Sequence, residues 1–358
     1  MVNRGRIGAR EPGKRERLVN ACYWLGLMPT IRWLREQTRR DLRILAYHRV
    51  LDVTDPDAFD FDLELISASS EQFREQMKLV KRRLHPLRFD ELLGMIDSGK
   101  RLPPNAIVVT FDDGYDDNYH VALPILRELG IPATFFVSTG HIDSGLPYAY
   151  DWLVHMVCAT RETRIEVTEL DLQCTLPDNR AKRREIAADL LDRMKWLDDA
   201  RQSELISRLE REWRMPRAIH PACRPMTWDQ LREMQAVGME IGSHGVGHRM
   251  LSKLSAEEIR VEVADSKETL ERELGLAVNV FAYPVGGIDA YNENVIAAAA
   301  HAGYRLACNY VTGTNRLPLA HPYSLHRLRV ERDLSLASFA GMTAWPEVFG
   351  YRTRHRIS

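Results

Sequence analysis

The sequence lacks paired cysteines and long apolar runs. Its five cysteines are odd in number, are scattered along 358 residues, and never form a Cys-x-x-Cys pair. This spacing argues against a disulfide framework and a cysteine-ligated zinc site, and is typical of proteins in a reducing compartment. No segment reaches the roughly 18 apolar residues that a membrane-spanning helix needs, and no secretory signal is recognisable. We therefore expect a cytoplasmic protein.

An excess of charge of either sign is also missing. The formal net charge is −1, whereas a dedicated nucleic-acid-binding protein usually carries a basic excess. Apolar residues make up 45% and charged residues 28% of the chain, which allows a sizeable core. The composition predicts a globular protein that does not bind nucleic acid.

Residues 1–42 differ from the rest of the chain because they are basic and amphipathic. The apolar stretch 18–28 has arginines on both sides, among them Arg17 and Arg32. Such a segment could lie at the inner face of an anionic membrane. It could also form a helix that packs on the outside of the domain.

Short apolar segments alternate with helical patterns over residues 43–358. Each apolar segment ends at a polar residue, which is typical of strands buried on both faces of a parallel sheet. The expected strands cover 43–47, 106–111, 133–137, 239–243, 278–283 and 325–330, with helical patterns at 70–84, 119–129, 227–237 and 255–274. This alternation predicts an α/β architecture, in which catalytic groups gather where the strands end.

Residues 140–225 interrupt the alternation. They contain two long charged helical patterns, at 181–199 and 202–214, and no clear strand. We interpret this part as a helical insertion between two strands. It could cover the site, contact a partner or have no function.

Two adjacent carboxylates follow the expected strand at 106–111. In Thr110-Phe-Asp-Asp-Gly-Tyr115, Asp112 and Asp113 leave the strand with their side chains in different directions. One can therefore bind a cation while the other faces substrate or water. Gly114 permits the tight turn beyond them.

Two histidines follow the expected strand at 239–243. In Ser243-His-Gly-Val-Gly-His248 the two glycines argue for a loop rather than a helix. His244, His248 and one carboxylate would leave positions open for water and substrate, as in a catalytic metal site. These ligands suit Zn²⁺, and also Ni²⁺, Co²⁺ or Fe²⁺.

Two further histidines lie near the first and last expected strands. His48 follows the first one in Tyr47-His-Arg-Val50, and His326 lies in the last one. Either could be a general acid or a structural residue, and His48 could also be a third imidazole ligand.

Three of these segments resemble motifs of the polysaccharide deacetylases, the NodB-homology group also called carbohydrate esterase family 4. They are the segments 110–115, 243–248 and Phe281-Ala-Tyr-Pro-Val-Gly286, and the resemblance covers about residues 43–332. It implies a distorted (β/α)7 barrel that hydrolyses the N-acetyl group of an amino sugar.

The same resemblance implies roles for individual residues. Asp113, His244 and His248 would bind the metal. Asp112 would be the general base, and the backbone N–H of Tyr115 would help to stabilise the oxyanion.

Two positions depart from the usual pattern of this family. An arginine that orients the base is usual where this chain has Ala282, and a tyrosine is usual at Val285. The Phe-Ala-Tyr-Pro form and the early segment 47–50 resemble a branch linked to exopolysaccharide metabolism, in which the barrel is circularly permuted. In that branch the early histidine is the general acid, which implies this role for His48. His326 is the second candidate.

The resemblance thus implies metal-assisted removal of N-acetyl groups from a polysaccharide or its lipid-linked precursor. Two alternatives stay open at this point. One is a deacylase, such as a deformylase, that acts on another amide at the same site. The other is a non-catalytic glycan-binding member of a polysaccharide synthesis complex.

Overall fold

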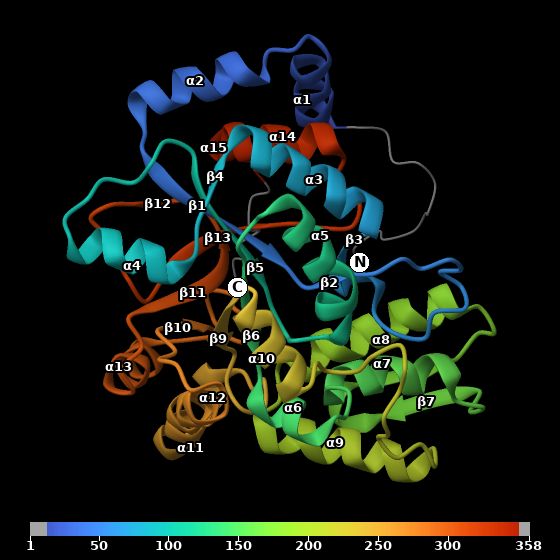
Figure 1. Ribbon diagram of the computed structural model, residues 1–358. Coiled ribbons are helices and arrows are strands. Elements are labelled where there is room, and N and C mark those ends of the chain that lie inside the picture. Colours follow the sequence, from blue (N-terminus) through green and yellow to red (C-terminus); the bar gives the residue numbers. More distant parts are fainter. Residues whose placement is uncertain (1–12, 351–358) are drawn as a thin grey trace.

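The computed structural model describes residues 13–350 and shows a closed barrel of parallel strands surrounded by helices (Figure 1). Residues 1–12, which belong to the basic N-terminal segment, lie outside the described residues. The barrel closes because β1 pairs in parallel with both β5 and β13. Its strands are β1 (Asp41–Tyr47), β5 (Ala106–Phe111), β6 (Thr134–Val137), β9 (Glu240–Ser243), β10 (Val280–Ala282), β11 (Leu306–Thr312) and β13 (Leu325–Arg329).

The expected α/β barrel is confirmed, with one strand that the sequence did not predict. This strand is β11, where the buried Asn309 interrupts the apolar run and the pairing with β13 shifts register. The Asn309 amide donates to the hydroxyl oxygens of Tyr291 and Ser324, so tertiary contacts satisfy this polar group inside the wall.

Side chains of the barrel strands alternate between the interior and the surrounding helices. Ile44, Val108 and Cys308 belong to one apolar cluster, whose members come from strands on different sides of the barrel. This cluster fills the barrel interior. Leu45 and Val109 belong to the cluster between the strands and the helices. The inward-facing side chains are therefore apolar along the strands. The polar candidate residues come after them, at the carboxyl end of the barrel.

Helices pack against the outside of the barrel. The expected helix at 255–274 is continuous, because a π-helical turn joins α11 to α12, and it begins with a capping box between Ser255 and Glu258. The helices are α3 (Ser70–Arg83), α4 (Phe89–Asp97), α5 (Leu123–Leu129), α10 (Trp228–Ala236), α11 (Ala256–Arg260), α12 (Ser266–Leu274), α13 (Glu293–His301), α14 (Leu336–Ala344) and α15 (Pro346–Phe349).

Short strands complete the wall. The two residues of β4 (His85–Pro86) extend the sheet beside β5, and those of β12 (Asn315–Arg316) pair antiparallel with β1. A separate pair consists of β2 (Arg49–Val50) and β3 (Ile66–Ala68).

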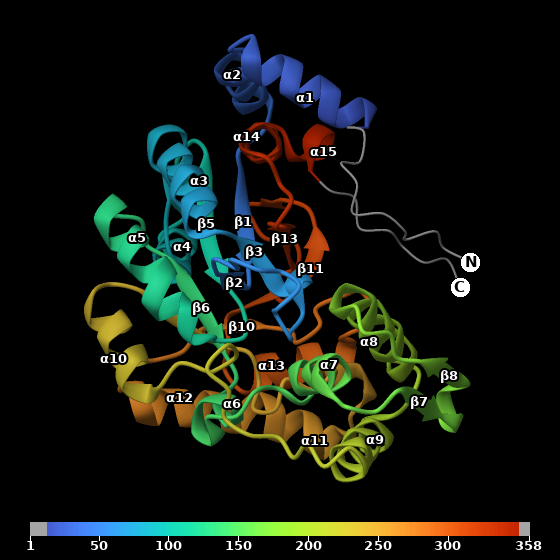
Figure 2. The same ribbon diagram turned by 90° about the vertical axis from the view of Figure 1, so that its right-hand side faces the viewer.

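The chain between β6 and α10 forms a layer with an apolar core of its own. Figures 1 and 2 show this layer at the end of the barrel opposite α1 and α2. Its elements are α6 (Thr139–Ser144), α7 (Ala149–Ala159), β7 (Arg164–Val167), β8 (Leu172–Thr175), α8 (Arg180–Met194) and α9 (Asp199–Glu212).

The prediction that this insertion contains no strand is wrong. The strands β7 and β8 pair as an antiparallel hairpin. In Arg164-Ile-Glu-Val167 exposed and buried side chains alternate, which is a strand signal, but it extends over only four residues.

Two N-terminal helices, α1 (Lys14–Trp24) and α2 (Met28–Thr38), pack on α14. The chain then enters the barrel directly, since β1 begins at Asp41. Within residues 13–350, no helix combines the length and the apolarity that crossing a membrane requires.

Candidate active site

Three barrel strands bring polar side chains to the carboxyl end of the barrel. Asp112 and Asp113 follow β5, His244 follows β9, and His48 follows β1. The N–H of Asp112 donates to the Tyr47 carbonyl oxygen at 2.9 Å, so the chain still follows the sheet at this aspartate. Each of these residues lies at or just beyond the carboxyl end of its strand. The closed barrel brings these strand ends, and so the residues, together.

Asp113, His244 and His248 converge on one point. Asp113 Oδ1 lies 3.4 Å from His244 Nε2 and 3.2 Å from His248 Nε2. The three possible ligand atoms all lie within 4.8 Å of one another. Asp113 Oδ1 is buried and has no hydrogen-bond partner among the described residues, so a divalent cation fits this set of atoms.

The contacts around these residues suit metal binding. His244 Nδ1 lies 2.7 Å from the carbonyl oxygen of Ala282, so its N–H donates to that oxygen and Nε2 keeps its lone pair for a cation. Burial alone would raise the pKa of Asp113, but its contacts with His244 and His248 hold this pKa well below the usual value. The carboxylate is therefore ionised at neutral pH.

The backbone of two of these residues is strained. Asp113 has φ = 73° and His248 has φ = 57°, in the left-handed region that side chains other than glycine rarely adopt. Such strain persists only where surrounding contacts hold it, and it concentrates at functional sites.

The loop from His244 to His248 closes around the buried carboxylate of Glu262. Glu262 Oε2 accepts hydrogen bonds from the N–H groups of Val246 and Gly247, both at 2.9 Å. A Cβ at Gly245, where φ is 81°, would lie 2.8 Å from the same oxygen. The expected loop is confirmed, and its first glycine is required by this close approach.

Asp112 forms a buried ion pair with Arg327 of β13. Arg327 Nη1 donates to Asp112 Oδ1 at 2.7 Å, and Nη2 donates to Oδ2 at 2.8 Å. Burial works to raise the pKa of Asp112, but the charge of Arg327 and its hydrogen bonds hold this pKa below the usual value. An ionised carboxylate at this position can accept a proton.

The family that the sequence resembles usually has an arginine at the position of Ala282. Here Arg327 of β13 supplies the arginine beside Asp112 instead. The sequence does not mark this arginine as a site residue, because Arg327 lies in no recognised motif and follows a histidine that is itself a candidate. A signal was present, since Arg327 continues the inward row of Leu325 and a buried arginine requires a partner.

The structure brings His48 into the site and leaves His326 outside it. The His48 ring packs edge-on against Tyr310, with ring centroids 5.3 Å apart, and Nδ1 lies 3.5 Å from the Tyr310 hydroxyl oxygen. His326 lies between the inward-facing Leu325 and Arg327, so its side chain points to the opposite face of β13. There it contacts Gly313, where a Cβ would lie 2.8 Å from that of His326.

Comparison with known proteins agrees with this geometry. Residues 99–307, more than half of the chain, match the family described as polysaccharide deacetylase. The chain belongs to the polysaccharide deacetylase family. The polysaccharide deacetylase YxkH of Bacillus subtilis (strain 168) is 23% identical over 314 residues, which cover 87% of this chain and 78% of the relative. The poly-β-1,6-N-acetyl-D-glucosamine N-deacetylase of Staphylococcus aureus (strain N315) is 34% identical over 107 residues, 27% of this chain and 36% of that protein.

Two solved structures share the fold of this deacetylase. The Streptococcus pyogenes deacetylase PplD, in complex with acetate, has a TM-score of 0.58 at 21% identity and covers 86% of this chain and 100% of its own. IcaB from Ammonifex degensii has a TM-score of 0.54 at 19% identity and covers 86% of this chain and 97% of its own. Both support the distorted (β/α)7 barrel.

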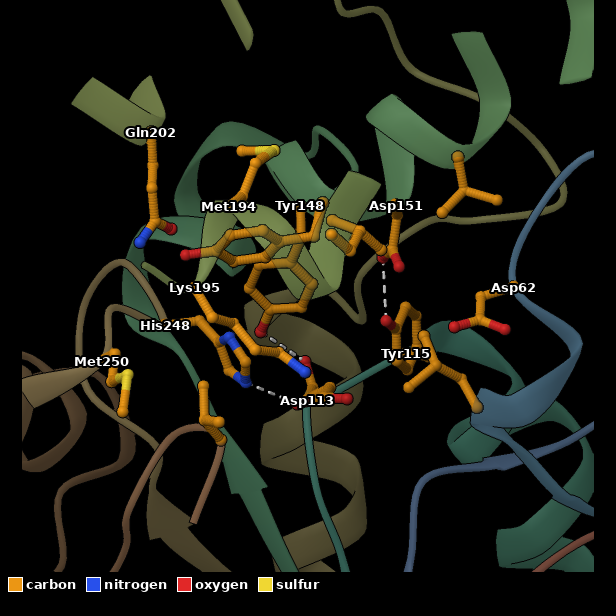
Figure 3. Close-up of a pocket in the computed structure, with 15 residues that line it drawn as sticks. Asp62, Asp113, Tyr115, Tyr148, Asp151, Met194, Lys195, Gln202, His248 and Met250 are labelled. Atoms are coloured by element: carbon orange, nitrogen blue, oxygen red, sulfur yellow. Dashed lines mark hydrogen bonds and ion pairs between the residues drawn. The ribbon is translucent and has the colours of Figure 1, made fainter. Parts of the chain in front are cut away.

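In this deacetylase the insertion contacts the turn that carries the two aspartates. The Tyr148 hydroxyl donates to the backbone carbonyl of Asp113 at 2.8 Å, and the Tyr115 hydroxyl donates to Asp151 Oδ2 at 2.8 Å (Figure 3). Burial raises the pKa of Asp151 to about 6, although the bond from Tyr115 opposes this shift. Tyr148 and Asp151 come from the insertion and support the site, a role that the sequence did not indicate.

The insertion also covers a cavity of about 220 Å³ beside Asp113. Figure 3 shows side chains of the insertion, such as Met194 and Gln202, across the cavity from the barrel residues. The lining residues from the barrel and its loops are Asp62, Leu65, Asp113, Tyr115, His248, Met250 and Val285, and those from the insertion are Tyr148, Tyr150, Asp151, Val154, Leu191, Met194, Lys195 and Gln202. The deacetylase site thus opens into a partly roofed pocket with mixed polar and apolar walls.

Proposed function

We propose that this deacetylase removes N-acetyl groups from amino sugars by metal-assisted hydrolysis. The observation that carries the proposal is the cluster of Asp113, His244 and His248 directly beside an ionised, arginine-paired Asp112. This arrangement combines a cation site that has open positions with a neighbouring proton acceptor.

Asp113 Oδ1 and the two Nε2 atoms of His244 and His248 would hold the metal. The donor set suits Zn²⁺, with Ni²⁺, Co²⁺ or Fe²⁺ as alternatives. When bound, such an ion polarises the acetyl carbonyl and makes water a stronger acid.

The residues of the chain supply the proton transfers. Asp112, kept ionised by Arg327, accepts the proton of the attacking water. The backbone N–H of Tyr115 donates to the oxyanion that develops on the acetyl carbonyl. A protonated His48 donates to the nitrogen of the amine, which otherwise leaves poorly.

The roofed pocket favours the end of a sugar chain as substrate. Its volume of about 220 Å³ is small beside the 300–1,000 Å³ that is usual for ligand sites, and it suits one sugar residue. Side chains of the insertion lie across this pocket from Asp113, which favours a chain end over a run of several sugar residues. The proposed substrate is a terminal N-acetylated amino sugar of a polysaccharide or of its lipid-linked precursor.

Acetate release is the direct test of this function. We expect the purified protein to release acetate from N-acetylglucosamine oligosaccharides, to lose this activity when chelation removes the metal, and to recover it when Zn²⁺ is added. Mass spectrometry of the products should show one deacetylated residue at a chain end.

Other outcomes would contradict the proposal. Release of formate from an N-formyl sugar, without acetate from its N-acetyl counterpart, would indicate a deformylase. Glycan binding without release of any acid would indicate a non-catalytic module. Deacetylation at internal residues of long chains would contradict the chain-end substrate while leaving N-deacetylation intact.

Replacement of His48 distinguishes the two candidate acids. We expect His48→Ala to lower kcat by about 10²–10⁴-fold, the usual contribution of a general acid. His326→Ala, on the outward face of β13, is the matched control and should keep nearly full activity. With an activated anilide as substrate, the kcat of His48→Ala should fall less, because the amine of this substrate leaves without full protonation. The opposite pattern for the two histidines would assign the acid to His326.

A further inference from the structure

The helix α2 turns its arginines toward the protein and its large apolar side chains toward solvent. Arg32 and Arg35 are buried, whereas Trp33 and Leu34 are 57% and 50% exposed. Arg35 donates to Asp41 at 2.9 Å, which explains why it faces inward. A helix on the surface of a soluble protein normally shows the reverse pattern, so the outward face needs another explanation.

The preceding helix and the turn after it also expose large apolar side chains. On α1, Val19 is buried, whereas Leu18, Trp24 and the adjoining Leu25 are 52%, 82% and 72% exposed. Of the 13 exposed large apolar side chains among the described residues, six lie between positions 18 and 34. We call these six the hairpin surface: Leu18, Trp24, Leu25, Leu27, Trp33 and Leu34.

Basic residues concentrate in the same part of the chain. Residues 1–40 contain ten basic and three acidic side chains, a net charge of +7, so the remaining residues carry −8 of the total of −1. Lys14, Arg17, Arg39 and Arg40, which belong to or follow α1 and α2, are exposed. The apolar hairpin surface thus lies in a strongly cationic segment, whereas the rest of the chain is acidic on balance.

We propose that the hairpin surface docks on an anionic lipid membrane. Exposed tryptophans and leucines insert at the boundary between headgroups and acyl chains, while neighbouring lysines and arginines attract anionic headgroups. Tryptophan is particularly suited to this boundary because its ring is largely apolar but carries one N–H donor. A second copy of the chain is a poorer occupant, because it would bring two cationic ends together.

The fold determines how a docked molecule would be oriented. The chain passes from α2 into the amino end of β1, whereas the catalytic residues follow the carboxyl ends of the strands. Figures 1 and 2 show α1 and α2 at one end of the molecule and the insertion at the other. The docked protein therefore turns its pocket away from the bilayer, a conclusion that rests on the proposed function of that pocket. Sugars would reach it from the aqueous side, which favours the end of a polysaccharide over a short lipid-linked precursor as substrate.

Vesicle co-sedimentation tests the docking. We expect the full chain to bind phosphatidylcholine vesicles that contain phosphatidylglycerol, to bind pure phosphatidylcholine vesicles weakly, and to lose affinity at high salt. Replacing both Trp24 and Trp33 by glutamine should weaken binding about tenfold or more, because these rings are the expected anchors. Acetate release from a soluble oligosaccharide should not change in this double variant, which separates the docking from the catalytic proposal.

Trp196→Gln is the matched control. Trp196 is 86% exposed but belongs to the insertion, at the opposite end of the protein, so its replacement should leave vesicle binding unchanged. Absence of binding to anionic vesicles, or equal binding by the double variant, would overturn the proposal. A wild-type dimer that becomes monomeric in the double variant would also overturn it, because a second copy would then cover the hairpin surface.

Discussion

Asp112→Asn should lower kcat by about 10²–10⁴-fold while the protein keeps its metal. The amide is nearly the same size as the carboxylate and can still accept a hydrogen bond from Arg327, but it cannot accept a proton from water at neutral pH. The three possible metal ligands, Asp113, His244 and His248, are unchanged in this variant, because Asp112 is not one of them. The measurements are the rate of acetate release and the metal content per chain.

His244→Ala is the contrasting control for this prediction. It removes one of three ligands, so both metal content and activity should fall. Full activity in Asp112→Asn with metal intact would show that another group is the base. Loss of metal in Asp112→Asn would show instead that the two aspartates do not have separate roles.

Arg327→Met should shift the pH dependence of the reaction as well as destabilise the protein. The variant leaves Asp112 buried without its counter-ion, and breaking such a pair typically costs about 3–5 kcal/mol of stability. Because Arg327 holds the pKa of Asp112 down, its loss lets burial raise that pKa. The base is then protonated over a wider range, so the rise of kcat/KM with pH should move to higher pH. Denaturant unfolding and a pH–rate profile measure the two effects.

Arg43→Met is the control that separates the effect of Arg327 on Asp112 from its effect on stability. Arg43 is a buried arginine of β1 that donates to Asn105 at 3.1 Å, far from the catalytic end of the strand. Its replacement removes another buried arginine and should leave the pH profile unchanged. An unchanged profile in Arg327→Met as well would mean that Arg327 serves stability alone. Arg327→Lys, which keeps the charge but not the paired hydrogen bonds, should recover part of the shift.

Local patterns were sufficient to predict six of the seven barrel strands and the two aspartates and two histidines from which the proposed metal site is drawn. The apolar run of β5 ends directly at Asp112 and Asp113, and the glycines between His244 and His248 exclude a helix. These signals lie within a few residues of one another. They depend on strand burial and on the allowed backbone angles of glycine, which are properties of a short segment.

Strands with weak or interrupted patterns could not be predicted from the sequence. The strand β11 contains the buried Asn309, whose amide is satisfied by Tyr291 and Ser324 of other segments. The hairpin of β7 and β8 is short, and the four-residue alternation in β7 is a weak signal. Contacts with other segments stabilise β11, whereas β7 is stabilised by its pairing with β8.

Short segments of the sequence establish the chemistry available at the strand ends, namely two adjacent carboxylates and the imidazoles of His48, His244 and His248. Which groups surround them depends on contacts between segments that are far apart in the chain. Arg327 reaches Asp112 across 215 positions, and Asp151 reaches Tyr115 across 36. Barrel closure brings β13 and β5 to either side of β1, and the alternation of side chains then turns Arg327 inward and His326 outward. That choice depends on the register of the closed barrel, which no short segment of the sequence contains.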